Sequence, residues 1–137
     1  YSNLLTKFAK CCNPIPGDDI IGFVSRGKGV TIHRKDCELI NKNSEQERLI
    51  ECSWNINKND AFVGSLTIIG NNNTNTIASI SKKISDLKIN ILRMKSNIIN
   101  KDSIVVNLSV NVKSKEDLNF IISKLKILSN VIDVNRS

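Results

Sequence analysis

Aromatic side chains are scarce in this chain of 137 residues: they make up 4% of it, as one Trp, one Tyr and four Phe. So few rings argue against a base-stacking platform for single-stranded nucleic acid. Long apolar runs are also missing, which excludes a membrane-spanning helix. The length suits one compact domain or two small ones, so any catalytic site must be small.

A targeting signal and a disulfide framework are absent as well. The chain begins at Tyr1 without Met, a basic segment or an apolar segment, so we interpret it as part of a longer protein with no visible targeting signal. It contains four cysteines, of which Cys11 and Cys12 are adjacent. This usage favours a metal site or free thiols in a reducing compartment, and we expect a cytoplasmic location.

Positive charge is in excess. The chain carries 20 Lys/Arg against 13 Asp/Glu, a net charge of +7. Residues 1–60 hold nine basic and eight acidic residues, whereas residues 61–137 hold eleven and five. The excess permits an anionic partner such as RNA without requiring one. The polar stretch 55–60 at this boundary predicts a linker.

Residues 61–137 show a clear alternation of strands and helices. Residues 103–113 alternate strictly between an apolar face and a mixed face, which is typical of an antiparallel strand with one solvated side. Further strands are predicted over residues 62–70, 89–99 and 131–134.

Apolar residues recur at helical spacing between these strands. One helix is predicted through Ile77–Leu87 after the cap candidates Asn73 and Thr74, and a second through Leu118–Leu125 after a capping-box match that starts at Ser114. The resulting order, β-α-β-β-α-β, predicts a ferredoxin-like fold in which both helices cover one face of a four-stranded antiparallel sheet.

Residues 1–57 are less periodic and predict a small β-rich domain. Residues 20–24 and 30–33 flank Arg26-Gly27-Lys28-Gly29, which predicts a hairpin whose glycines supply positive φ. Residues 49–56 alternate again and predict one more strand, in which Cys52 would be a buried small hydrophobe.

Four potential metal ligands stand out in this first domain: Cys11, Cys12, His33 and Cys37. Together they could close a tetrahedral zinc site. Adjacent cysteines tend to point apart, so spacing alone leaves zinc and reduced structural thiols equally open. The small size of the domain favours a metal, because about 60 residues rarely supply enough core on their own.

A catalytic interpretation of the same residues is weaker. A Cys–His nucleophile needs a base and an oxyanion hole, and His33 is the only histidine. Asp18 and Asp19 follow Pro16-Gly17, where carboxylates usually cap a turn or face solvent. We therefore assign no catalytic residue.

Basic side chains gather in sequence near the candidate ligands, among them Arg26, Lys28, Arg34 and Lys35. They could contact the RNA backbone, and a solvated basic surface is an equally simple explanation.

The motifs now form a specific pattern. The run 10–18 (Lys-Cys-Cys-Asn-Pro-Ile-Pro-Gly-Asp), continued through Ile21-Gly22, Gly27-Lys28-Gly29 and 33–37 (His-Arg-Lys-Asp-Cys), resembles the conserved-cysteine or zinc-finger-like segment of RelA/SpoT-family stringent-response proteins. The second unit resembles their terminal ACT domain. The resemblance implies a non-catalytic regulatory fragment of a (p)ppGpp synthetase/hydrolase that couples ribosome or amino-acid status to distant N-terminal catalytic domains of the same chain.

The resemblance also implies roles for particular residues. Cys11, Cys12, His33 and Cys37 would be the metal ligands, and Asp36 would lie in a segment linked to regulation. Ribosomal RNA of the large subunit and the A-site tRNA would be partners.

ACT domains often bind an amino acid at the first strand–helix loop through an Asp-Arg-x-Gly-Leu-Leu-like run. Here that loop offers Asn72, Asn73, Asn75 and Thr76 and lacks the Asp, the Arg and the Gly. We therefore expect weak or no amino-acid binding.

We thus expect an α+β protein with a cysteine-containing domain over 1–57 and an ACT domain over 61–137 that forms a homodimer, with no membrane partner. Two alternatives remain open: a branched-chain amino-acid-sensing ACT dimer, and a thiol- or metal-dependent enzyme.

Overall fold

The computed structural model describes residues 6–27, 29–42, 45–55 and 60–137. Its contacts divide the chain into two compact units, Tyr1–Asp60 and Ala61–Ser137, here called the N-terminal and C-terminal units. Most of the predicted linker, residues 56–59, lies outside the described residues. In the described part of the chain, no helix is long and apolar enough to cross a membrane.

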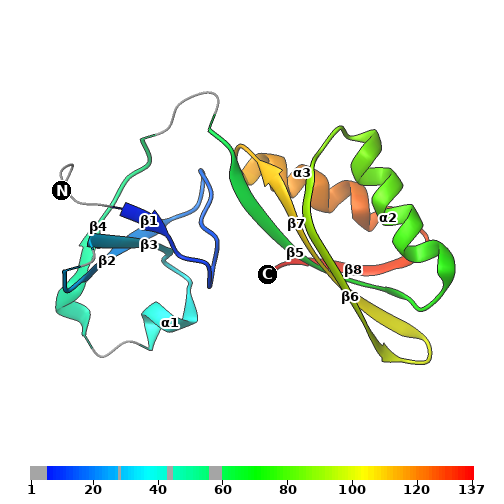
Figure 1. Ribbon diagram of the computed structural model, residues 1–137, viewed down its shortest axis with the longest axis horizontal. Coiled ribbons are helices and arrows are strands. Elements are labelled where there is room, and N and C mark those ends of the chain that lie inside the picture. The colour runs from blue at the N-terminus through cyan, green and yellow to red at the C-terminus, as the bar shows by residue number, and fades with distance from the viewer. Residues whose placement is uncertain (1–5, 28, 43–44, 56–59) are drawn as a thin grey trace. The chain divides into compact units, whose positions relative to one another are not determined.

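The C-terminal unit has the predicted β-α-β-β-α-β order (Figure 1). Its elements are β5 (Phe62–Asn71), α2 (Thr74–Asp86), β6 (Ile91–Asn100), β7 (Ser103–Val112), α3 (Lys115–Lys126) and β8 (Val131–Arg136). The strands lie in the order β6-β7-β5-β8, and every neighbouring pair is antiparallel. The ferredoxin-like prediction is confirmed.

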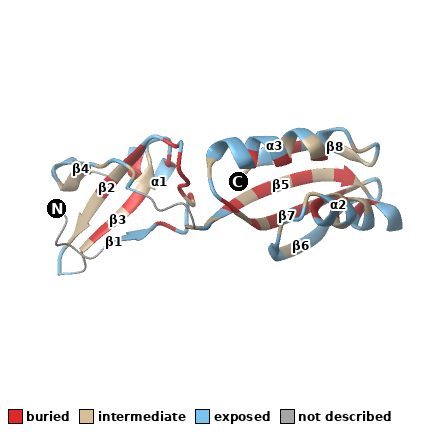
Figure 2. Ribbon diagram, turned by 90° about the horizontal axis from the view of Figure 1, so that it is seen from above, coloured by how far each residue is buried: buried red, intermediate tan, exposed pale blue. Residues whose placement is uncertain are grey.

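The core of this unit lies between the sheet and its two helices. Along β7, the residues Ile104, Val106, Leu108, Val110 and Val112 are buried, as their alternation predicts (Figure 2). Leu118, Ile121 and Leu125 of α3 and Ile80 and Ile84 of α2 complete the core.

Side-chain caps fix where the two helices begin. The Asn73 carboxamide oxygen accepts from the backbone N–H of Asn75, and Ser114 Oγ accepts from that of Asp117. The Asp117 carboxylate in turn accepts from the backbone N–H of Lys113 at 3.0 Å. A capping box therefore starts α3 as predicted, with the reciprocal bond shifted by one residue.

The N-terminal unit is a four-stranded sheet in the order β1-β3-β2-β4. Its elements are β1 (Thr6–Phe8), β2 (Ile20–Ser25), β3 (Gly29–Arg34), the short helix α1 (Glu38–Asn41), a 3₁₀ turn η1 (Gln46–Arg48) and β4 (Leu49–Glu51). The β2–β3 hairpin is confirmed, with positive φ at Gly27 and Gly29. β1 pairs with β3 in parallel, a pairing that no sequence pattern predicted.

The strand predicted over residues 49–56 is wrong in its length. Regular pairing with β2 ends at Glu51, and Ile56 lies outside the described residues. Cys52 and Trp54 still pack against the buried cluster of Ile20, Val30 and Ile32, although Cys52 is only half-buried. The Trp54 indole donates to the carbonyl of Asp18 at 3.0 Å, so this segment is held by a side chain instead of a β-ladder.

A candidate metal centre in the N-terminal unit

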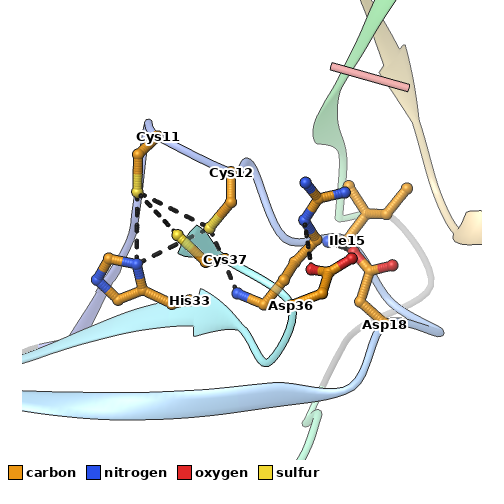
Figure 3. A network of polar contacts seen from close by, with 8 residues as sticks. Cys11, Cys12, Ile15, Asp18, His33, Asp36 and Cys37 are labelled. Atoms are coloured by element: carbon orange, nitrogen blue, oxygen red, sulfur yellow. Dashed lines mark hydrogen bonds and ion pairs between the residues drawn. The ribbon is translucent and has the colours of Figure 1, made fainter. Parts of the chain in front are cut away.

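The structure brings all four predicted ligands together at one end of the first sheet. Cys11 and Cys12 lie in the turn that follows β1, His33 lies in β3, and Cys37 lies directly before α1. Their Sγ atoms and one ring nitrogen all lie within 4.8 Å of one another. Figure 3 shows the four side chains pointing toward a common centre.

Two local features of the backbone produce this convergence. The parallel pairing of β1 with β3 continues in a hydrogen bond from Ala9 N to Ile32 O, which carries the cysteine pair to the His33 end of the hairpin. Next, a turn closed by a bond from Cys37 N to Arg34 O folds the chain back, so that Cys37 faces the same point.

Adjacent cysteines can share the site because the chain turns sharply after them. The backbone N–H of Asn13 donates to Ala9 O, and Asn13 itself has a φ of 43°, in the left-handed region that Asn tolerates. This turn lets Cys11 and Cys12 aim at one centre, with their sulfurs 3.9 Å apart.

The distances between the ligand atoms can be compared with those around a tetrahedrally coordinated zinc ion. Cys11 Sγ lies 3.7 Å from Cys37 Sγ and 3.4 Å from His33 Nδ1, and Cys12 Sγ lies 3.9 Å from that nitrogen. Zinc–ligand bond lengths require about 3.8 Å between two sulfurs and about 3.6 Å between sulfur and nitrogen in a tetrahedron. Four of the six ligand–ligand distances are therefore close to those of a tetrahedral zinc site, and all six lie within 4.8 Å.

The surroundings of the ligands affect their protonation states in different ways. The backbone N–H of Arg34 donates to Cys12 Sγ at 3.3 Å, a contact that helps a thiolate. Burial raises the pKa of the Cys12 thiol to about 12 and also raises that of Cys11. Burial lowers the pKa of His33, so its ring is neutral and free to coordinate.

Cys37 is the exception among the thiols. Burial raises the pKa of Cys37. Hydrogen bonds from the backbone N–H groups of Ile40 and Leu39 and from the other two thiols lower this pKa by more than burial raises it, so the net shift is downward. Cys37 is therefore the thiol that loses its proton first.

A rigid turn next to the cysteines depends on Asp18, whose importance the sequence analysis underestimated. The Asp18 carboxylate is buried and accepts from the backbone N–H of Ile15 at 2.8 Å, and Ile15 is fully buried between the two prolines. A carboxylate three residues after an amide, in Pro-Ile-Pro-Gly-Asp, is the signal that could have identified this cap.

The predicted RNA-contacting residues do not form one cluster. Arg34 and Lys35 lie beside the metal ligands, where Arg34 Nε is 3.4 Å from an Asp36 carboxylate oxygen and Lys35 is exposed. Arg26 is exposed at the tip of the hairpin, at the opposite end of β3. Lys28 lies outside the described residues.

The predicted ligand loop of the C-terminal unit is largely occupied by its own hydrogen bonds. Asn73 caps α2, the Asn72 amide donates to Lys101 O, and the buried Thr76 hydroxyl donates to Asn71 O at 2.6 Å. Asn75 is exposed.

Comparison with known proteins matches both units. A model described as the RelA/SpoT RIS domain matches residues 1–55, and one described as an ACT domain matches residues 58–136. The chain is 27% identical over 137 residues to the GTP pyrophosphokinase of Escherichia coli (strain K12), an alignment that covers 98% of this chain and 18% of that protein.

Two further relatives agree. The bifunctional (p)ppGpp synthase/hydrolase RelA of Mycobacterium tuberculosis is 29% identical over 134 residues, covering 97% of this chain and 18% of that protein. The crystal structure of the ACT domain from GTP pyrophosphokinase of Chlorobium tepidum covers 57% of this chain and 100% of that chain, with a TM-score of 0.50 and 24% identity, a likeness of fold.

The fold and the two domain matches define a regulatory region made of a RIS domain and an ACT domain. The chain belongs to the RelA/SpoT family and corresponds to the C-terminal, non-catalytic region of its members. It spans about a fifth of the length of the curated relatives that it matches.

Proposed function

We propose that this region couples ribosome or amino-acid status to catalytic domains of the same protein that make and hydrolyse (p)ppGpp. The observation that carries the proposal is the pairing of a RIS domain with an ACT domain in one chain, which aligns over both units with relatives named GTP pyrophosphokinase.

Zinc is the metal we propose for the site of Cys11, Cys12, His33 and Cys37. Three thiols and one imidazole are soft and borderline donors that zinc prefers, and a closed set of four favours a structural role. When bound, zinc would hold the cysteine turn, β3 and α1 together. Asp36, which pairs with Arg34 beside this centre, is the residue through which we propose that the segment affects regulation.

Ribosomal RNA, with the A-site tRNA beside it, is the partner we propose for the N-terminal unit. Arg26 lies about 17 Å from Arg34 along β3, at roughly 3.3 Å per residue. An extended polyanion can reach both ends, and contacts to phosphates need no aromatic platform.

Ribosome co-sedimentation of this chain tests the proposal. Arg26→Glu and Lys35→Glu should each weaken association, and the difference from the wild type should shrink as salt is raised, because a lost phosphate contact no longer releases counterions. Lys42→Glu is the matched control, since Lys42 is an exposed lysine of the same unit, just after α1. Equal sedimentation of all variants would contradict an RNA-binding role.

A further inference from the structure

The face of the C-terminal sheet that does not contact the helices carries a groove. It encloses about 270 Å³, several times the roughly 30 Å³ that one water occupies. The groove is lined by residues of β5, β6, β7 and the last residue: Ser65, Leu66, Arg93, Lys95, Asn107, Leu108, Ser109 and Ser137. Because strand residues alternate, the side chains of Ser65, Asn107 and Ser109 point away from the core that holds Leu66 and Leu108.

Two cations stand on one wall of this groove. The register of β6 with β7 places Arg93 opposite Ser109 and Lys95 opposite Asn107, so both basic side chains share the open face, about 7 Å apart. Both are exposed, and neither side chain has a hydrogen bond or ion pair among the residues that the structure describes.

No Asp or Glu side chain lines the groove, and Ser137, the last residue of the chain and part of the lining, forms no ion pair with Arg93 or Lys95. The nearest acidic residue in the register of this face, Asp133, lies on β8 at the far edge of the sheet, and its carboxylate accepts from Asn135 Nδ2 and Val134 N. Two like charges without a partner repel each other, and a bound anion would relieve that repulsion.

The neutral residues of the groove are arranged as donors. The Thr67 hydroxyl donates to Asn107 Oδ1 at 3.3 Å, which leaves the Asn107 Nδ2 amide free to donate into the groove. The hydroxyl of Ser109, which lies opposite Arg93 in the register, adds a further donor beside its guanidinium.

We propose that this groove binds phosphate groups, supplied by a free nucleotide or by the backbone of single-stranded RNA. Arg93 and Lys95 provide the charge, and Asn107 and Ser109 provide neutral hydrogen bonds. No aromatic ring lines the groove, so recognition is of the phosphates and not of a stacked base.

Titration of the whole 137-residue chain followed by amide NMR tests this. The probes are inorganic pyrophosphate, GDP and an eight-nucleotide oligouridylate. We expect shifts at Ser65, Asn107 and Ser109, and at least a tenfold loss of affinity in the double variant Arg93→Gln/Lys95→Gln. The control Lys115→Gln/Lys126→Gln removes two exposed charges from α3 and should bind within twofold of the wild type.

The three probes separate the two sources of phosphate. Groove-dependent binding of pyrophosphate and GDP supports a nucleotide, and groove-dependent binding of the oligouridylate alone supports an RNA backbone. Absence of shifts in the groove with all three probes, or an equal loss of affinity in the control variant, would overturn the proposal. Both pairs of side chains are exposed, so loss of folding does not confuse the result.

Discussion

The protonation states of the four ligands show what a metal must do in the N-terminal unit. Cys12, with its pKa near 12, and Cys11, with a raised pKa, carry protons at neutral pH when no ion is present. A bound metal ion would displace those protons, and coordination bonds would offset the cost of burying the thiolates.

Removal of one ligand should therefore abolish metal binding. We expect one zinc per chain by elemental analysis of protein purified without chelator, and none in Cys37→Ser. Cys52→Ser is the matched control, because Cys52 packs against the cluster of Ile20, Val30 and Ile32, outside the ligand set, and this variant should keep the metal.

Two results would contradict this prediction. Wild-type protein without any bound metal would leave the thiols as structural groups. Zinc retained in Cys37→Ser would mean that another residue completes the coordination.

The identity of the candidate metal ligands could be predicted from the sequence, but the backbone conformation that brings them together could not. The types and spacing of Cys11, Cys12, His33 and Cys37 identify candidate ligands, but only the positive φ of Asn13 shows how neighbouring cysteines converge. The dispersal of the basic residues likewise depends on strand register, since Arg26 and Arg34 are close in sequence and lie at opposite ends of β3.

Edge strand β6 is the element most in need of a partner. It has only β7 beside it in the described sheet, and its Ile91, Leu92, Ile98 and Ile99 are exposed. An unpaired edge with apolar side chains promotes pairing with another chain, so we propose a homodimer through this strand.

A charged residue on this edge should disrupt the dimer. We expect sedimentation velocity to show a dimer for the wild type and a monomer for Ile98→Lys. Ile127→Lys should remain dimeric, because Ile127 is equally exposed, at 69% against 70%, but lies at the end of α3. A wild type that stays monomeric at high concentration would contradict the proposal.

We expect no amino acid to bind the loop from Asn71 to Thr76. Three of its side chains already serve the fold, and no cationic side chain in the loop offers a partner for a carboxylate. Calorimetry with valine, isoleucine and leucine should therefore detect no binding. Micromolar affinity for any of them would favour an amino-acid sensor instead.

Elements with strong periodicity could be predicted, and short ones could not. The strict alternation of β7 and the capped helices specify the C-terminal fold, because one face of each element must be buried. β1 has only three residues, all exposed, so its parallel pairing leaves no pattern to read. β4 ends at Glu51, and beyond it the Trp54 indole donates to Asp18 O, a side-chain contact that strand alternation does not predict.

The molecule as a whole consists of two units with separate cores, and a single fluorophore distinguishes them. Trp54, the only tryptophan, lies in the N-terminal unit and stacks on Phe8 at 5.5 Å. Its fluorescence therefore follows the unfolding of that unit alone.

Removal of metal should destabilise one unit selectively. We expect a strong chelator to lower the Tm followed by Trp54 fluorescence, because the ion stabilises only the fold that binds it. The calorimetric transition of the C-terminal unit should stay unchanged, since all four ligands belong to the other unit. A fluorescence Tm that is insensitive to the chelator would contradict a structural metal.

The position of the ligands along the chain also sets an order of events during synthesis. Cys11 and Cys12 are synthesised before their partner ligands His33 and Cys37, which emerge more than twenty residues later. The site therefore cannot form until β3 has paired with β1. Until Cys37 has been made, the growing chain exposes a vicinal pair of thiols without its partners. Once Cys37 is available, a metal ion can close this long loop, and the N-terminal unit can finish folding while the ACT domain is still being translated.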